Sequence, residues 1–215
     1  MPWSSNATFL AEVRCGDDEM RAIYKPLRGE RPLWDFPNGL FRREVAAWRL
    51  SELLGWGIVP ETIVRGDDAP LGEGSLQRFV EADFEQHYFT LYENEANHDA
   101  FRRMCAFDIV ANNTDRKSGH CLVTADGHIW GIDNGLSFST HASLRTVIWE
   151  FGGEPLPDDI VRDLERLPAL LPGDLATLLD EEEIEGVVER TEELLADGTF
   201  PMADAYGRAY PWPMV

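Results

Sequence analysis

Hydrophobic and polar residues alternate in short runs through the first eighty positions, as in β-strands, with one helical stretch between them. This pattern predicts strands over residues 7–14, 20–27, 58–64 and 74–80. In residues 41–54 the hydrophobic positions instead recur at helical spacing and are followed by a glycine, which predicts a helix that ends there.

From about residue 95 the spacing is mainly helical. A first helix has a hydrophobic face formed by Phe101, Met104, Cys105 and Ile109. Two short strands are expected next, at 120–124 and 128–132, joined by a turn that contains glycine. Two more helices are expected in the tail, one opening at Pro157 and the other with a hydrophobic stripe at Ile184, Val187, Val188, Thr191, Leu194 and Leu195.

These elements predict an α+β protein with two lobes. A β-rich N-terminal lobe would occupy residues 1–80, and an α-rich C-terminal lobe residues 81–215. The chain is long enough to bury a substantial core, and it shows no internal repeat.

The charge of the chain excludes some classes of partner. The formal net charge is −20, whereas nucleic-acid binding needs a basic surface, and docking on an anionic membrane needs basic residues as well. Acidic residues are densest in the C-terminal helices. A solvated face explains this density, and so does a docking surface for a basic protein partner.

Targeting and redox features are absent from the sequence. No run of residues is long and apolar enough for an integral membrane segment, and the first residues lack the pattern of a signal peptide. The three cysteines contain no Cys-x-x-Cys pair, so neither a disulfide framework nor a zinc site is indicated. A cytoplasmic location is therefore expected.

Lysine is scarce, because only two of the 19 basic residues are lysines. Lys25 lies in a predicted strand, and Lys117 lies two residues after Asp115. A phosphotransferase needs a lysine at both places, one on the nucleotide phosphates and one beside the catalytic aspartate. Codon bias is the alternative explanation.

The segment from Asp115 to His120 has the layout of a kinase catalytic loop. Asp115 would orient the hydroxyl of the acceptor, and Lys117 would neutralise charge on the transferred phosphoryl group. His120 stands where a metal-binding asparagine is usual. Because imidazole is a less natural ligand than oxygen for Mg²⁺, the sequence leaves Mg²⁺ and Mn²⁺ both open.

Asp133 follows the second short strand and is a candidate metal ligand for the ions that bridge the phosphates. By itself, the Asp-Asn-Gly sequence is equally typical of a hairpin turn. On the N-terminal side, Glu44 lies early in the predicted helix, where it could pair with Lys25 and fix it on the phosphates; a surface position is the alternative. Small polar residues before the first strand could offer backbone N–H groups to a phosphate, namely Ser4, Ser5 and Asn6.

Together these residues resemble the phosphatidylinositol 3/4-kinase-like superfamily, with the type II phosphatidylinositol 4-kinase branch most similar and the HipA-type kinases more distant. The chain also resembles a small actinobacterial family of kinase-like proteins. The resemblance covers roughly residues 3–138 and rests on Ser4-Ser-Asn-Ala-Thr-Phe9, Tyr24-Lys-Pro26, Val59-Pro-Glu-Thr62, Gly74-Ser-Leu-Gln-Arg-Phe-Val-Glu81, Asn113-Thr-Asp-Arg116 and Ile132-Asp-Asn-Gly-Leu136.

The resemblance implies a minimal bilobal protein-kinase-like fold with ATP between the lobes. It places the adenine beside a hinge that contains Gln77, Phe79 and Val80. Two features depart from the family. His120 replaces the usual asparagine, and the cysteine-rich insert and basic surface of the lipid kinases are missing.

The expected activity is transfer of the γ-phosphate of ATP to a hydroxyl acceptor, with Mg²⁺ or Mn²⁺. The acceptor is expected to be a protein Ser/Thr, an inositol-like small molecule or a lipid, in that order. Three alternatives remain open at this point: AMP transfer on a kinase fold, a catalytically weak pseudokinase-like module that binds ATP and a partner, and an α+β protein whose motifs are fortuitous.

Overall fold

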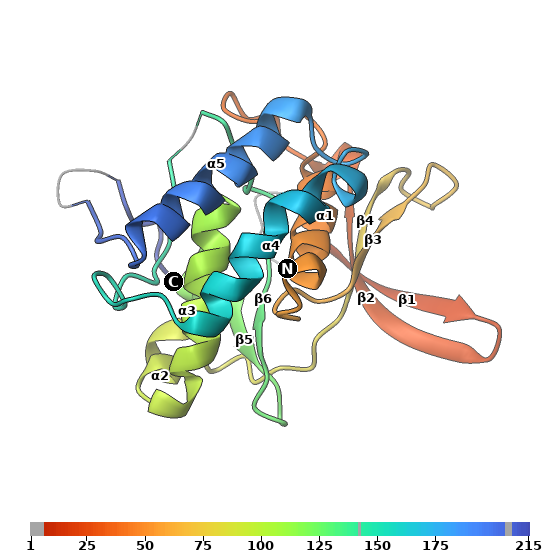
Figure 1. Cartoon of the computed structure of the whole chain (residues 1–215). Coiled ribbons are helices and arrows are strands. Elements are labelled where there is room, and N and C mark those ends of the chain that lie inside the picture. Colours follow the sequence, from red (N-terminus) through yellow and green to blue (C-terminus); the bar gives the residue numbers. More distant parts are fainter. Residues whose placement is uncertain (1–6, 142, 205–207) are drawn as a thin grey trace.

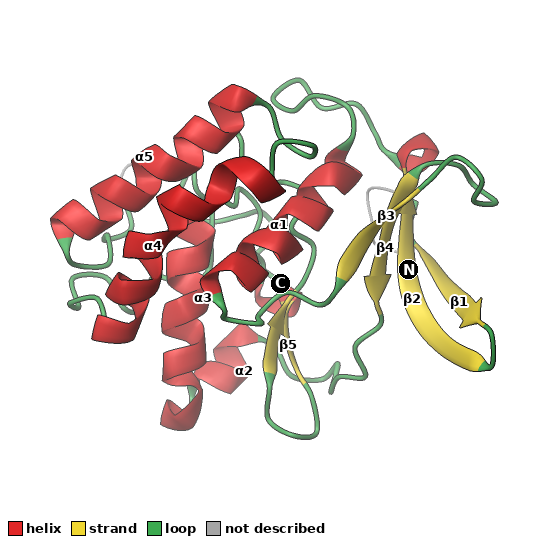
Figure 2. Cartoon of the chain, turned by 45° about the vertical axis from the view of Figure 1, so that its right-hand side comes forward, coloured by secondary structure: helices red, strands yellow, loops and turns green. Residues whose placement is uncertain are grey.

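A β-sheet and a group of helices occupy opposite sides of the molecule (Figures 1 and 2). The computed structural model describes residues 7–141, 143–204 and 208–215. The four-stranded antiparallel sheet has the order β1-β2-β4-β3, formed by β1 (Phe9–Cys15), β2 (Asp18–Pro26), β3 (Thr62–Arg65) and β4 (Gly74–Arg78).

The first hairpin sets the direction of Lys25. Strands β1 and β2 pair from Phe9 opposite Tyr24 to Cys15 opposite Asp18. Along the inner half of β2, Ala22 and Tyr24 are buried while Lys25 is partly exposed. Since successive side chains of a strand point to opposite faces, Lys25 projects from the face opposite Tyr24.

Helix α1 (Leu40–Leu54) joins the two sides of the molecule. It is flanked by Gly39 and Gly55, both of which have positive φ angles, 96° and 70°. It packs against the sheet and against α4 (Asp158–Asp174). Its apolar side contributes Ala46, Ala47, Leu50 and Leu54 to the main core.

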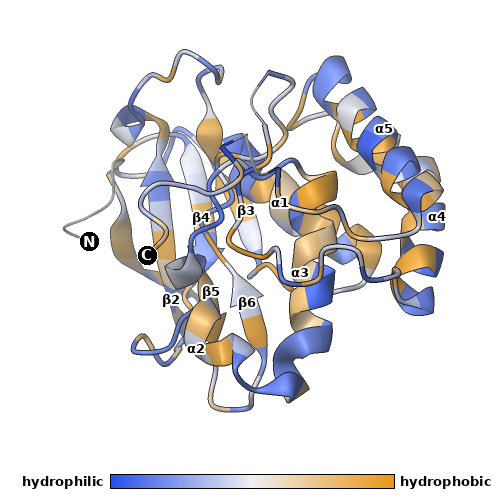
Figure 3. Ribbon diagram, turned by 90° about the vertical axis from the view of Figure 1, so that its left-hand side faces the viewer, coloured by the Kyte–Doolittle hydropathy of each residue, from blue (hydrophilic) through white to orange (hydrophobic). Residues whose placement is uncertain are grey.

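The helical side is built around α3 (His98–Val110), with α5 (Glu181–Asp197) packed against it and against α4. This side also contains α2 (Tyr88–Tyr92) and the hairpin of β5 (Cys121–Val123) and β6 (Ile129–Gly131). Figure 3 shows hydrophobic residues on α1 and α3 inside the molecule, and mainly hydrophilic residues on the outer face of α5.

Most of the elements predicted from the sequence are present, and the mixed α+β architecture is confirmed. The strand expected at 58–64 is shorter and starts at Thr62. The backbone N–H groups of Ile58 and Val59 donate to the side chain of Ser51, at 2.9 Å and 3.3 Å, and Pro60 has no N–H to donate. The short helix α2 was not predicted.

The core does not break at the predicted lobe boundary. One cluster of buried side chains includes residues of α1 together with residues of α3, α4 and α5. Helix α1 packs against both the sheet and the other helices. The boundary between two lobes at residue 80 stays a prediction from the sequence. No helix among the described residues is long and apolar enough to span a membrane.

A buried ion pair links α1 to α5. The guanidinium of Arg43 contacts the carboxylate of Glu183, and the side chains are only 4% and 8% exposed. Glu183 also accepts a 3.0 Å hydrogen bond from the backbone N–H of Asp180 and so completes a capping box at the start of α5.

Replacing Glu183 by glutamine should destabilise the fold although the capping box can persist. Glu183→Gln keeps a side-chain oxygen for Asp180 but leaves the buried Arg43 without a counter-charge, which should cost about 3 kcal/mol of unfolding free energy. Urea unfolding followed by tryptophan fluorescence measures this. The matched change Glu185→Gln, at an exposed position of the same helix, should shift stability by less than about 0.5 kcal/mol. Equal losses in the two variants would contradict the assignment.

Candidate active site

Three charged residues from separate elements meet at one point. Lys25 comes from β2, Glu44 from α1, and Asp133 from the segment after β6. The ammonium of Lys25 contacts the carboxylate of Glu44 and lies 2.8 Å from Oδ1 of Asp133. The structure therefore contains the Lys25–Glu44 pair expected from the sequence and adds Asp133 to it.

Glu44 also holds the backbone next to Asp133. Its second oxygen accepts a 3.1 Å hydrogen bond from the N–H of Asn134, and Glu44 itself is 3% exposed. A Cβ atom at Gly135 would lie 3.2 Å from Oε1 of Glu44. Glycine at position 135 thus allows this close approach, and the surface alternative for Glu44 is wrong.

The electrostatic interactions among these three residues keep Lys25 and Asp133 charged. Burial alone would lower the pKa of Lys25, but Asp133 and Glu44 outweigh it and raise that pKa above its ordinary value. The pKa of Asp133 lies well below its usual range, chiefly because of the Lys25 ammonium. At neutral pH the site therefore presents a cation and an ionised carboxylate side by side.

Asp115 and Lys117 form a second pair in the predicted catalytic loop. Nζ of Lys117 lies 2.8 Å from Oδ2 of Asp115, and the N–H of Asp115 donates to the side-chain oxygen of Asn113 at 3.0 Å. Burial raises the pKa of Asp115, and the hydrogen bond and charge of Lys117 oppose this rise. Both side chains are about a quarter exposed or less, so solvent and a substrate can reach them.

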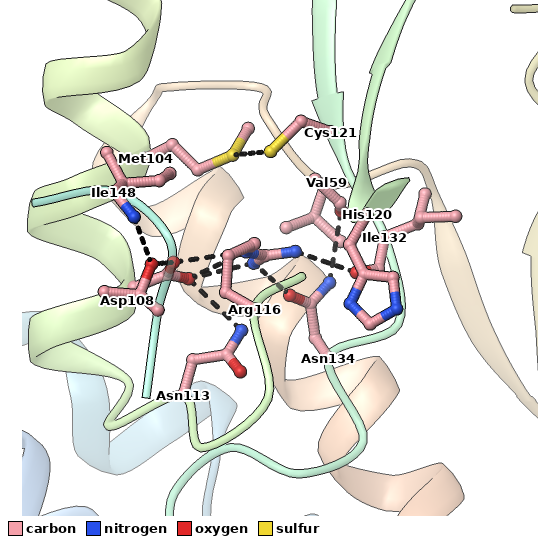
Figure 4. Close-up of polar contacts among 12 residues, drawn as sticks. Val59, Met104, Asp108, Asn113, Arg116, His120, Cys121, Ile132, Asn134 and Ile148 are labelled. Atoms are coloured by element: carbon pink, nitrogen blue, oxygen red, sulfur yellow. Dashed lines mark hydrogen bonds and ion pairs between the residues drawn. The ribbon is translucent and has the colours of Figure 1, made fainter. Parts of the chain in front are cut away.

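A buried salt bridge ties the catalytic loop to the rest of the site (Figure 4). Arg116 and Asp108 are both fully buried, and Arg116 donates to both carboxylate oxygens of Asp108 at 2.9–3.2 Å. Arg116 also donates to the carbonyl oxygen of Ile132 at 2.8 Å and to the side-chain oxygen of Asn134 at 2.6 Å. One guanidinium therefore joins the end of α3, the catalytic loop and the residues on both sides of Asp133.

Asp108 is fully satisfied as an acceptor. Besides Arg116, it receives hydrogen bonds from Nδ2 of Asn113 at 3.2 Å and from Oγ1 of Thr146 at 3.0 Å. From the sequence, Arg116 is included only as the last residue of the Asn113–Arg116 motif. No role is assigned there to Asp108. The available signal was an aspartate among the hydrophobic residues near the end of α3, because a charge in such a position needs a buried partner.

His120 lies beside Asp133, with Nε2 at 3.4 Å from Oδ2. Burial lowers the pKa of His120 to about 4, so the ring is neutral at physiological pH. Its Nδ1 accepts a 3.3 Å hydrogen bond from the N–H of Lys117. The proton of the neutral ring therefore belongs on Nε2, the nitrogen that lies 3.4 Å from Oδ2 of Asp133.

The donors present suit a metal held mainly by a nucleotide. The described part of the chain contains no group of three or more His, Cys, Asp and Glu side chains placed to hold an ion. Asp133 supplies carboxylate oxygens, and His120 is the adjacent candidate. Mg²⁺ in nucleotide sites commonly has one or two carboxylates and takes its other ligands from phosphates and water, so these residues fit such an ion.

The predicted hinge leads from the sheet to the β5–β6 hairpin. The side chain of Gln77 is used within the sheet, since Nε2 donates to Oγ1 of Thr62 at 2.9 Å. The N–H of Phe79 donates to the carbonyl oxygen of Arg21 at 3.0 Å, and Val80 is buried. The Gln77 side chain and the Phe79 N–H are therefore both used in contacts within the protein.

The phosphate-binding segment proposed at Ser4, Ser5 and Asn6 lies outside the described residues.

The Arg116–Asp108 salt bridge should be essential to stability. Asp108→Asn keeps the shape of the side chain but leaves the buried Arg116 charge uncompensated, so the unfolding free energy should fall by about 3–5 kcal/mol. Asp68→Asn removes the acid of the exposed Arg65–Asp68 pair and should cost no more than about 1 kcal/mol. Urea unfolding of both variants makes the comparison. A loss for Asp108→Asn as small as that for Asp68→Asn would contradict the role of the salt bridge.

Comparison with solved structures identifies the fold. The chain resembles a Golgi casein kinase with Mn and ADP bound, with a TM-score of 0.55 and 13% identity over 100% of this chain and 76% of that one. It also resembles the Helicobacter pylori proinflammatory kinase CtkA, with a TM-score of 0.51 and 11% identity over 92% and 90% of the two chains. Hydra Fam20, in a structure with sugar, gives a TM-score of 0.53 and 11% identity over 90% and 82%. These similarities confirm the bilobal kinase-like fold.

Comparison of sequences identifies the family. Protein Rv2133c of Mycobacterium tuberculosis is 36% identical over an alignment 248 positions long, which spans 98% of this chain and 88% of the relative. The model of the phosphatidylinositol 3- and 4-kinase family matches residues 67–196, more than half of the chain. The match includes Asp115, Lys117, His120 and Asp133. The chain therefore belongs to the phosphatidylinositol 3- and 4-kinase family.

Proposed function

We propose that this protein is an ATP-dependent phosphotransferase that moves the γ-phosphate to a hydroxyl group. The observation that carries the proposal is the meeting of Lys25, Glu44 and Asp133, which come from three separate elements. An ion pair with a purely structural role needs only one carboxylate to neutralise one lysine. Here the lysine lies between two carboxylates, an arrangement that suits a lysine on nucleotide phosphates beside a metal-binding aspartate.

Four residues would each have a separate role in phosphate transfer. Lys25 binds the phosphates of ATP, and Glu44 holds the Lys25 side chain in place. Asp115 accepts a hydrogen bond from the acceptor hydroxyl and orients it for attack on the γ-phosphorus. Lys117 lies beside Asp115 and neutralises charge that develops on the transferred group.

Asp133, with His120 beside it, would hold Mg²⁺ or Mn²⁺. Such an ion supplies positive charge to the phosphate oxygens and orients them. In the tautomer described, the proton of His120 is on Nε2, which lies 3.4 Å from Oδ2 of Asp133. Ligation through Nε2 would require the proton to move to Nδ1, at the expense of the hydrogen bond from Lys117.

The acceptor is ranked by the charge around the site. Residues 136–145 follow Asp133 and contain a single arginine and no lysine. A multiply phosphorylated headgroup would need several cations, so a protein Ser/Thr ranks first, an inositol-like small molecule second and a lipid third. Transfer of AMP on the same fold is the alternative reaction, and a catalytically weak module that binds ATP and a partner is the alternative role.

Transfer of label from γ-labelled ATP tests the proposal. The intact protein, with Mg²⁺ or Mn²⁺ and a cell extract, should label one acceptor fraction: protein, small molecule or lipid. Asp115→Asn should reduce the rate by at least about 100-fold, because a positioned carboxylate contributes about 10²–10⁴-fold. Asp133→Asn should reduce it at least as much, whereas Asp17→Asn, at an exposed turn, should leave it unchanged.

The same experiment separates the alternatives. Label that appears from α-labelled but not from γ-labelled ATP would replace the proposal by AMP transfer. ATP binding without transfer of either label would leave the nucleotide-binding module.

The identity of residue 120 should set the metal preference. His120→Asn supplies an amide oxygen, which Mg²⁺ prefers to an imidazole nitrogen. The ratio of the Mg²⁺-supported rate to the Mn²⁺-supported rate should therefore rise by about tenfold or more. Initial rates at matched metal concentrations measure the ratio, with the intact protein as the reference. An unchanged ratio would show that His120 does not act on the metal.

A further inference from the structure

The C-terminal segment, residues 208–215, lies against the catalytic loop. The N–H of Ser118 donates to the carbonyl oxygen of Met214 at 2.8 Å. Earlier in the segment, the carbonyl oxygen of Ala209 accepts from the backbone N–H of Thr146 and from Nε1 of Trp149, each at 3.1 Å. The last residues of the chain are thus fixed at two points.

The catalytic loop is held on its other side by residues 145–147. Arg116 donates to the carbonyl oxygen of Arg145 at 3.0 Å and accepts from the N–H of Val147 at 3.1 Å. These contacts fix Arg116, and the contact with Met214 fixes Ser118. Lys117 lies between them, so both of its neighbours in the chain are held by backbone hydrogen bonds.

Ser118 depends on the C-terminal segment for its N–H partner. It is fully buried and opens the short 3-10 turn Ser118–His120. The first N–H groups of such a turn have no partner within it. A buried N–H without a partner costs about 1–3 kcal/mol, so the contact with Met214 favours this loop conformation over others.

The polar contacts of the segment are made by its backbone, and its largest side chain is exposed. Trp212 is 89% exposed and Val215 is 70% exposed, whereas the smaller residues Ala209 and Pro211 are buried. The carbonyl groups of Ala209 and Met214 therefore provide the polar contacts. A segment that only filled a hydrophobic groove would bury its largest side chains instead.

We propose that residues 208–215 are a positioning element of the active site, in which the Met214 carbonyl holds the Ser118 amide and so fixes Lys117 beside Asp115. This inference rests on the phosphotransferase function proposed above. The nucleotide phosphates would be bound by Lys25 and by the metal ion that Asp133 would hold, and these residues belong to other segments. Loss of the C-terminal contact should therefore slow transfer and leave ATP binding intact.

Deletion of residues 213–215 from the otherwise full chain tests the proposal. The deletion removes the Met214 carbonyl, whereas the control Val215→Ala retains it. Hydrogen exchange at the Ser118 amide should become at least tenfold faster in the truncated protein, because its acceptor is gone. The maximal transfer rate should fall about 10–100-fold, since a small displacement of catalytic groups has effects of this size. The dissociation constant of ATP should stay within about twofold.

A milder variant tests the same proposal in case the truncated chain does not fold. Trp149→Phe keeps an aromatic ring but removes the side-chain donor to the Ala209 carbonyl, which retains only the hydrogen bond from the Thr146 N–H, so one anchor of the segment is weakened. Exchange at Ser118 should accelerate and transfer should slow, both by less than in the deletion, again with unchanged ATP affinity.

Each outcome decides a separate point. Unchanged exchange at Ser118 after the deletion would overturn the contact itself. Faster exchange with an unchanged transfer rate, or an equal loss of ATP affinity, would overturn the positioning role. Failure of the intact protein to transfer phosphate would overturn the proposed function and the catalytic consequence with it, while the exchange comparison would still decide whether Met214 holds the loop.

Discussion

The buried Arg116–Asp108 salt bridge is the interaction on which the rest of the site depends. A guanidinium and a carboxylate without contact to solvent are stable only if nearly all their hydrogen-bonding groups find partners. Those partners include Asn113, Asn134 and the backbone at Ile132. Satisfying one buried ion pair therefore requires the end of α3, the catalytic loop and the segment around Asp133 to adopt one arrangement.

The second constraint acts between the sheet and the helices. Lys25 is a residue of the sheet, and its partner Asp133 follows the β5–β6 hairpin on the helical side. Glu44 of α1 bridges them, because it contacts Lys25 through one oxygen and the N–H of Asn134 through the other. The charged centre is thus built where the two sides meet, and α1 can hold it because its own apolar face belongs to the common core.

The outcome for individual residues shows which signals the sequence contains. The pairing of Lys25 with Glu44 could be expected, since a lone lysine on a strand and an acid early in the next helix form a recognisable pattern. His120 could be located but not interpreted. Its tautomer follows from the hydrogen bond with Lys117 and from the position of Asp133, and neither can be deduced from spacing. Strand β3 starts only at Thr62 because the backbone N–H groups of Ile58 and Val59 donate to the side chain of Ser51.

The sequence by itself determined the order of most helices and strands and the candidate residues for the chemistry, because hydrophobic periodicity, turn residues and motif spacing are local properties. Only the tertiary structure decided which buried charges pair and which backbone groups meet. The contacts of Arg116 with Asn134 and of Ser118 with Met214 join residues at separations that no periodic pattern specifies. They exist because buried polar groups must find partners once the core has brought distant segments together.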